Sequence, residues 1–158
     1  MQFVFYVIFA AAVVLADQLT KALVVANIPL GGHAAFLPGF LDFTYVRNTG
    51  AAWSSFEGMI WLFTLVFIVL TVALIWEFSR KRLPFTTLER WGIVAIYGGG
   101  LGNMIDRLRL GYVVDMIETQ FMEFPVFNVA DCFITCGCIA LFVSLGLFNK
   151  EFWKEEKK

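Results

Sequence analysis

GMIWLFTLVFIVLTVALIW, residues 58–76, is an unbroken apolar stretch that contains no charged side chain. A helix needs about 20 apolar residues to cross the hydrocarbon core of a bilayer. A stretch of this length and purity is therefore a candidate transmembrane helix, and the rest of the chain can be interpreted around it.

Three further apolar stretches predict three further spans, at about residues 3–26, 90–112 and 128–148. The first is interrupted only by Asp17 and Lys21, and the last carries only Asp131. A cleaved signal peptide is the alternative for the first stretch, but such a peptide has a basic beginning and a shorter apolar core. We expect one membrane domain, residues 1–158, of the all-α class, with four transmembrane helices.

The composition agrees with a membrane protein. Hydrophobic residues make up 59% of the 158 residues and charged residues only 16%, whereas soluble domains carry roughly 25% charged residues. The net charge is −1, and no basic stripe with interleaved aromatic residues is present, so nucleic acid is not expected as a partner. The three cysteines all lie in the last apolar stretch, which suits neither a disulfide framework nor zinc-binding knuckles.

The distribution of Lys and Arg predicts the orientation, because cytoplasmic loops collect these residues. The segments that follow the second and fourth stretches are basic, with Arg80, Lys81, Arg82, Arg90, Lys150, Lys154, Lys157 and Lys158. The other two loops hold only Arg47, Arg107 and Arg109. Both termini should therefore be cytoplasmic, and the polar residues of chemical interest should lie toward the outer face.

A small β-element is expected in the loop between the first two spans, at about residues 36–57. Residues 40–47 are rich in aromatic and β-branched side chains, and Asn48-Thr49-Gly50 follows as a turn. This extracytoplasmic element would rest on the helical bundle.

Ionisable groups inside a membrane are costly unless they are paired or face a wet cavity, so each is a functional candidate. Asp17 and Lys21 are four residues apart, in the order that favours an ion pair on a helix. Asn103, Asp106 and Arg107 share one helix face, as a recognition surface or as an Asp–Arg network at the helix end. The glycines of residues 98–102 lack the pattern of a phosphate loop and indicate close helix packing instead.

Asp115 and Asp131 form the strongest catalytic candidate. They lie near the outer ends of the third and fourth spans, which are joined by a short connection and should be antiparallel neighbours. Two carboxylates in contact share a proton and so supply a base and an acid together, as in aspartic proteases. Intramembrane carboxylates equally serve in proton or ion relays, so both interpretations stay open at this point.

Other chemistries have less support in the sequence. Ser54 or Ser55 could form a catalytic dyad with Lys21. A metal site or a Ser-His-Asp triad would depend on His33, the only histidine, which we expect at the surface. The cysteines are expected to pack in the core as small hydrophobic residues.

Five short motifs resemble one known family, the lipoprotein signal peptidases, also called signal peptidase II. They are DQLTK at 17–21, NTGAAW at 48–53, GGLGNMIDR at 99–107, VVD at 113–115 and FNVAD at 127–131. Each motif is weak alone, but all five occur in the family's order and together are specific. Trp53 stands where the family more often has Phe, and both residues are aromatic.

The resemblance implies a four-helix bundle with an outer β-cradle and an aspartic peptidase site without metal or cofactor. It implies that the enzyme cuts bacterial prolipoproteins before a diacylglyceryl-modified cysteine, in the cytoplasmic membrane and among its lipids. It places the catalytic pair on Asp115 and Asp131. The supporting or substrate-binding positions are Asn48, Asn103, Arg107, Asn128, Asp17 and Lys21.

A small proton-coupled transporter or channel subunit is the alternative function. It would use Asp115, Asp131 and Arg107 as a relay. Such a relay needs a polar path across the membrane, and the second and fourth spans offer none on the cytoplasmic side.

Overall fold

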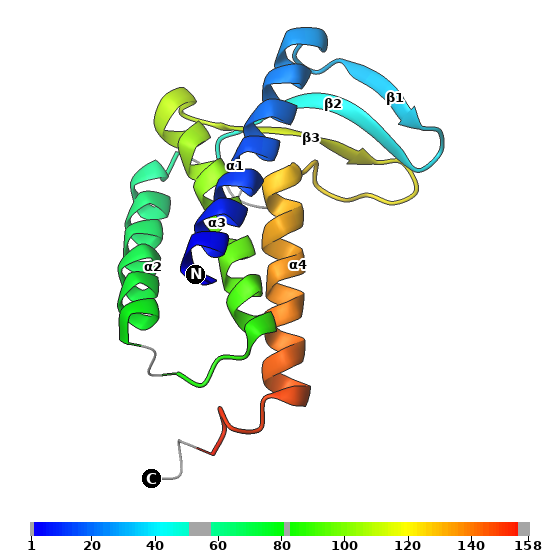
Figure 1. Ribbon diagram of the computed structural model, residues 1–158. Helices are drawn as coiled ribbons and strands as arrows, with labels where there is room; N and C mark the ends of the chain where they lie inside the picture. The colour runs from blue at the N-terminus through cyan, green and yellow to red at the C-terminus, as the bar shows by residue number, and fades with distance from the viewer. Residues whose placement is uncertain (1, 51–57, 81–82, 155–158) are drawn as a thin grey trace.

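The computed structural model describes residues 2–50, 58–80 and 83–154. These residues form four long helices: α1 (Gln2–Asn27), α2 (Ile60–Arg80), α3 (Thr87–Leu110) and α4 (Val129–Val143), the last continued by a π-helical turn, Ser144–Phe148. Three antiparallel strands, β1 (His33–Leu37), β2 (Leu41–Asn48) and β3 (Val113–Thr119), form a sheet in that order. Figure 1 shows the sheet at one end of the bundle and both termini directed away from it.

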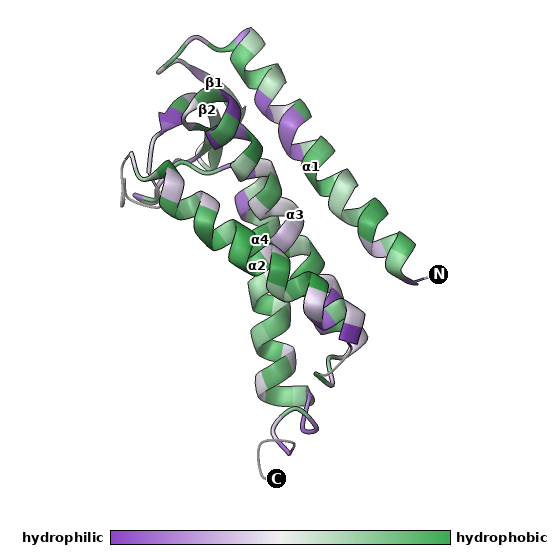
Figure 2. Ribbon diagram, turned by 90° about the vertical axis from the view of Figure 1, so that its left-hand side faces the viewer, coloured by the Kyte–Doolittle hydropathy of each residue, from purple (hydrophilic) through white to green (hydrophobic). Residues whose placement is uncertain are grey.

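Three helices of the described residues are long and apolar enough to cross a membrane: α1, α2 and α4 with its π-helical turn. The exposed side chains of α2 are almost all apolar. In Figure 2, which colours the ribbon by hydropathy, most of α2 and α4 has the colours of hydrophobic residues. The third predicted span, α3, is less apolar because it contains a glycine cluster and charged residues at both ends.

Helix α3 lies at the centre and packs against the other three helices. Its glycines make this possible. A Cβ atom on Gly98 would lie 3.1 Å from Cβ of Val13 on α1, and one on Gly99 only 2.4 Å from the carbonyl oxygen of Ala130 on α4. A Cβ on Gly100 would lie 3.3 Å from a ring carbon of α2. The close packing predicted for residues 98–102 is confirmed.

The sheet corrects part of the prediction. Strand β2 confirms the strand expected at 40–47, but β1 begins at His33, in a segment interpreted as a loop, and β3 was not predicted. The apolar run that contains β3 resembles the end of a span, and only its pairing with β2 identifies it as a strand. Residues 51–57 of the expected β-element lie outside the described residues.

Two features fix β3 relative to the helices. Helix α3 ends at Gly111, whose φ of 81° lies in the left-handed region that favours glycine, and the chain turns there into the strand. Met116 and Val114 of β3 then pack with Tyr45 of β2 and Val24 of α1 in a buried hydrophobic cluster. The C-terminal end of α1 therefore anchors the sheet.

The ends of α3 and α4 that lie away from the sheet are joined by polar contacts. Glu89 is fully buried and forms a capping box with Thr86 at the start of α3. Its carboxylate also accepts hydrogen bonds from Ser144 Oγ at 2.8 Å and Asn149 Nδ2 at 2.7 Å. These contacts hold the two helices together far from the sheet.

Candidate active site

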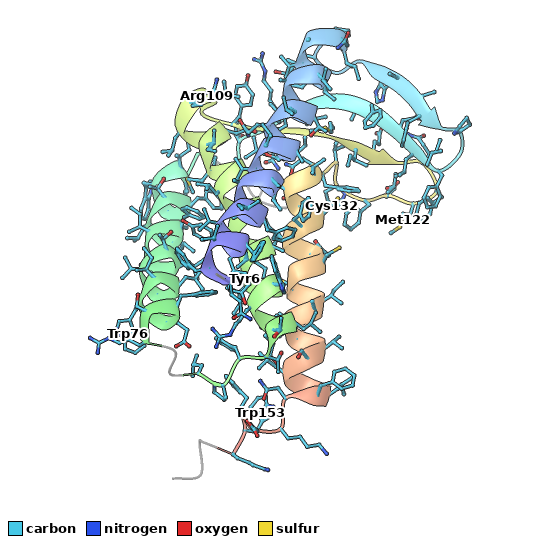
Figure 3. The ribbon with its side chains drawn as sticks, in the orientation of Figure 1. Tyr6, Trp76, Arg109, Met122, Cys132 and Trp153 are labelled. Atoms are coloured by element: carbon cyan, nitrogen blue, oxygen red, sulfur yellow. The ribbon has the colours of Figure 1, made fainter. Side chains whose placement is uncertain are left out.

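Asp115 and Asp131 line one cavity of about 900 Å³, below the sheet and between α2, α3 and α4. Asp115 comes from β3, and Asp131 from the first turn of α4. Figure 3 labels Cys132, which directly follows Asp131 in the chain, at the end of α4 nearest the sheet. The two carboxylates predicted to meet do line the same cavity, although one is carried by a strand.

Asp115 is almost completely buried, with 3% of its surface exposed. Its Oδ2 accepts a hydrogen bond from Asn48 Nδ2 at 2.9 Å, and its Oδ1 accepts one from Asn128 Nδ2 at 2.7 Å. Burial raises the pKa of Asp115 to about 6; the hydrogen bonds from both asparagines oppose this rise, and the charge of Asp131 adds to it. Such a carboxyl can hold a proton near neutral pH.

Asp131 is held by the start of its own helix. It is the third helical residue, and its Oδ2 accepts a hydrogen bond from the backbone N–H of Asn128 at 3.1 Å. Asn128 is the N-cap, and its Oδ1 accepts from the backbone N–H of Asp131 at 3.0 Å. The other carboxylate oxygen accepts from Asn103 Nδ2 at 2.8 Å. The FNVAD motif is thus a capping box that orients a carboxylate.

Asn128 links the two aspartates. It is fully buried, and its Nδ2 donates both to Asp115 Oδ1 and, at 3.0 Å, to Asn103 Oδ1. The resemblance assigned a supporting role to three asparagines, at positions 48, 103 and 128. All three donate hydrogen bonds to the carboxylate pair.

A buried ionic cluster lies behind the asparagines. Lys21 Nζ lies 2.8 Å from Asp17 Oδ2 and 2.9 Å from Asp106 Oδ2, and it donates to Asn103 Oδ1 at 2.9 Å. The ion pair predicted between Asp17 and Lys21 is confirmed. Its third member, Asp106, and the neighbouring Gln18, which donates to Asp106 Oδ1 at 2.9 Å, were not predicted. The i, i+3, i+4 spacing marked Asp106 as polar, but it did not reveal the partner.

The cluster also holds the backbone beside each aspartate of the pair. Asp17 Oδ1 accepts from the backbone N–H of Ala130 at 3.0 Å, and Asp106 Oδ2 accepts from that of Val114 at 3.1 Å. Ala130 and Val114 directly precede Asp131 and Asp115. The cluster therefore sets the positions of both chain segments that carry the pair.

Arg107 lines the same cavity. Its terminal guanidinium nitrogen donates to the carbonyl oxygen of Gly50 at 2.8 Å, and its guanidinium carbon lies 4.3 Å from the ring centre of Phe63. The sequence placed Asn103, Asp106 and Arg107 on one helix face. In the structure, Asn103 and Arg107 line the cavity, whereas Asp106 forms an ion pair with Lys21. The guanidinium adds a fixed positive charge near the carboxylates.

The other chemistries considered from the sequence depend on Ser54, Ser55, His33 or a group of metal ligands. Ser54 and Ser55 lie outside the described residues. His33 is exposed on β1, with Nδ1 3.0 Å from Glu118 Oε2, in agreement with the surface position expected. Among the described residues, no three His, Cys, Asp or Glu side chains are grouped as metal ligands.

The prediction that the cysteines pack in the core is wrong. Cys136 is exposed, Cys132 and Cys138 are only partly buried, and all three are free thiols. The apolar sequence around them reflects a surface suited to lipid and a cavity wall rather than a protein core.

Comparisons with known proteins show which family the chain resembles over most of its length. The family model described as Signal peptidase (SPase) II matches residues 9–147. The lipoprotein signal peptidase of Enterococcus faecalis is 43% identical over 150 residues, which cover 93% of this chain and 91% of the relative. That of Streptococcus agalactiae is 44% identical over 141 residues, with 89% and 86% covered.

A solved structure described as a bacterial membrane enzyme superimposes with a TM-score of 0.83 at 34% identity. The match covers 89% of this chain and 87% of the chain of that structure. A second, with the same description, has a TM-score of 0.82 at 33% identity, with 92% and 94% covered. The match of the family model over most of the chain, together with these relatives, identifies the protein: it belongs to the signal peptidase II family.

Proposed function

We propose that this chain cuts diacylglyceryl-modified bacterial prolipoproteins just before the lipidated cysteine, with Asp115 and Asp131 as its catalytic pair. Membership of a family of aspartic peptidases that remove signal peptides from prolipoproteins gives the reaction class. The observation that carries the assignment of residues is the single cavity lined by two carboxylates, each held by fixed hydrogen-bond donors.

The proposed reaction is acid–base hydrolysis. The ionised carboxylate takes a proton from a water molecule as the water oxygen bonds to the carbonyl carbon before the lipidated cysteine. The protonated carboxyl gives its proton to the carbonyl oxygen. The C–N bond then breaks as the first carboxyl gives its proton to the leaving nitrogen. At the same time the second carboxylate takes back a proton from one hydroxyl of the tetrahedral intermediate, which leaves a carboxylic acid and restores both carboxyl groups. A pKa of about 6 for Asp115 suits one protonated and one ionised partner near neutral pH.

The walls of the cavity suit a lipid-modified peptide. Its polar groups gather at the sheet end, whereas the walls toward the middle of the bundle are apolar and include Leu62, Val66, Leu70 and Ile134. A substrate that already lies in the membrane could place its apolar segment along this wall and its scissile bond at the carboxylates. Arg107 and Asn48 line the polar end and would contact the substrate backbone.

We place the enzyme in the bacterial cytoplasmic membrane with α3 as a fourth span. Arg80 and Lys150 lie at the end away from the sheet, as the rule of basic cytoplasmic loops requires if both termini are cytoplasmic. The sheet and the carboxylates would then lie toward the outer face. The apolar surfaces of α1, α2 and α4 would contact membrane lipids. The whole chain would form one domain.

The alternative, a proton-coupled transporter subunit, is not favoured by the family assignment. A relay would need polar groups along the middle of the bundle. There α3 buries Ile93, Val94 and Ala95 instead.

The deciding experiment compares cleavage by the wild type, Asp115→Asn and Asp131→Asn. The purified enzyme would be incubated with a diacylglyceryl-modified precursor and, as a control, with the same precursor without lipid. We expect signal peptide release from the lipidated precursor only, and a loss of at least about 10²-fold in either variant, because Asn can neither accept nor donate the required proton. Near wild-type turnover by either variant would refute the assignment of the pair.

A further inference from the structure

We infer that Lys21 is a positioning residue that keeps Asp131 ionised as the base, and so leaves the shared proton on Asp115. The inference rests on the proposed function and assigns the two aspartates different roles within it. The geometry that carries it is the chain of hydrogen bonds from the Lys21 ammonium through the Asn103 amide to Asp131.

Lys21 determines which atoms donate and which accept in this series of hydrogen bonds. An ammonium group can only donate hydrogen bonds, so the Asn103 atom 2.9 Å from Lys21 Nζ must be the amide oxygen. The other end of that amide is then NH₂, and it lies 2.8 Å from Asp131 Oδ1. Because Lys21 is 3% exposed and also paired with two carboxylates, its charge is held in place.

Backbone N–H groups fix the other two amides in the same way. The N–H of Asp131 donates to Asn128, which identifies that atom as Oδ1 and directs the Asn128 NH₂ to Asp115. The N–H of Gly50 donates to Asn48 Oδ1, and so directs the Asn48 NH₂ to the other oxygen of Asp115. Every carboxylate oxygen of the pair thus accepts one hydrogen bond.

The two aspartates differ in how strongly their hydrogen-bond donors favour a negative charge. Asp131 lies in the first turn of α4, where the helix dipole favours a negative charge, and one of its donors is a backbone N–H. Its other donor is the amide that Lys21 polarises. Both donors to Asp115 are neutral side-chain amides. Asp131 is therefore the better place for the charge, and Asp115 for the proton.

Other charged and titratable groups also act on the pair. Besides Lys21, they are Asp17 on α1, Asp106 and Arg107 on α3 and Cys132 on α4. Arg107 favours ionisation of both aspartates, and the charge of Asp17 partly offsets that of Lys21 at Asp131. The charge of Lys21 acts on both aspartates, but the NH₂ of the amide that it holds donates to Asp131, so Lys21 favours the negative charge on Asp131.

The test measures kcat/KM against pH for cleavage of a diacylglyceryl-modified precursor. Lys21→Met alone would leave two buried carboxylates without a cation, so the comparison is between Asp106→Asn and the double variant Lys21→Met, Asp106→Asn. Both retain Asp17, which keeps its hydrogen bond from Ala130. Thermal unfolding would establish that both fold.

We expect the acid limb of the profile to lie about one pH unit higher in the double variant, because a positive charge near the base is lost. Cleavage at pH values below the limb should therefore fall about tenfold, and cleavage above it should fall much less. An equal loss at every pH, with the limb unmoved, would mean a merely structural role and would overturn the inference.

Asn103→Leu gives a second test that leaves the ion pairs of Lys21 intact. It removes the amide between Lys21 and Asp131, so its acid limb should also move to higher pH, and an unmoved limb would likewise overturn the inference. Cleavage by the wild type distinguishes failure of the proposed function from failure of the role of Lys21. If it releases no signal peptide, the proposed function fails; if it does and neither limb moves, only the role of Lys21 fails.

Discussion

Replacement of Gly99 by Ala tests how closely α3 must approach the helix that carries Asp131. A Cβ atom there would lie 2.4 Å from the carbonyl oxygen of Ala130, whereas ordinary contacts begin near 3.4 Å. The atom is backbone and cannot rotate away, so the two helices must separate by about 1 Å. Ala130 directly precedes Asp131, and the shift would reach the carboxylate.

Two effects of different size are expected for Gly99→Ala. Overpacking should lower the free energy of unfolding by about 1–3 kcal/mol. A displacement of about 1 Å in a catalytic group can cost about 10²-fold in rate. We therefore expect a folded enzyme with a severe loss of turnover, measured by cleavage of the lipidated precursor at a temperature well below its unfolding midpoint.

Gly146→Ala is the matched control. A Cβ at Gly146 would meet no atom within 4 Å, and this glycine lies in the π-helical turn Ser144–Phe148 that continues α4. Alanine there should raise stability slightly, by up to about 1 kcal/mol, and leave turnover unchanged. If Gly99→Ala cleaves the precursor within a factor of two or three of Gly146→Ala, the close approach of α3 and α4 does not control the site.

Three further predictions concern charge, thiols and orientation. The pKa of Asp115 is raised from 3.8 to about 6, so the folded state binds this proton more tightly than the unfolded state, and wild-type stability should fall as pH rises from about 4 to 6. Asp115→Asn should remove this loss. In denaturant titrations its free energy of unfolding should exceed that of the wild type by up to about 3 kcal/mol at pH 8, but not at pH 4. If the variant and the wild type are equally stable at both pH values, the prediction is wrong. Replacement of Cys132, Cys136 and Cys138 by Ala should leave most cleavage activity, as should EDTA, and loss of activity in either case would point to a thiol or metal mechanism. Reporter fusions at Gly58 and at the C-terminus should lie on opposite sides of the membrane, and signals from one side would overturn the orientation.

The helices and the two carboxylates that line the cavity could be predicted from sequence because each leaves a local signal. Apolar stretches of membrane length indicate helices, and isolated carboxylates such as Asp115 and Asp131 stand out within them. Strand β3 leaves no such signal, because its residues are as apolar as a span and its partner β2 lies far away in the chain. The role of Asp106 was missed for a related reason. Helical spacing gives the face on which a residue lies, but not the side chain of another helix that meets it.

The hydrogen bond between Asp17 and the Ala130 amide joins residues 113 positions apart. Helix α1 is synthesised well before α4, and its contacts are complete only when α4 is in place. Until α4 has been inserted, Asp17 lacks the Ala130 amide, and the cavity lacks Asp131. Maturation of the peptidase must consequently follow its own synthesis to the end. A nascent chain stalled before α4 would occupy the membrane as an inert precursor, unable to cut neighbouring lipoproteins.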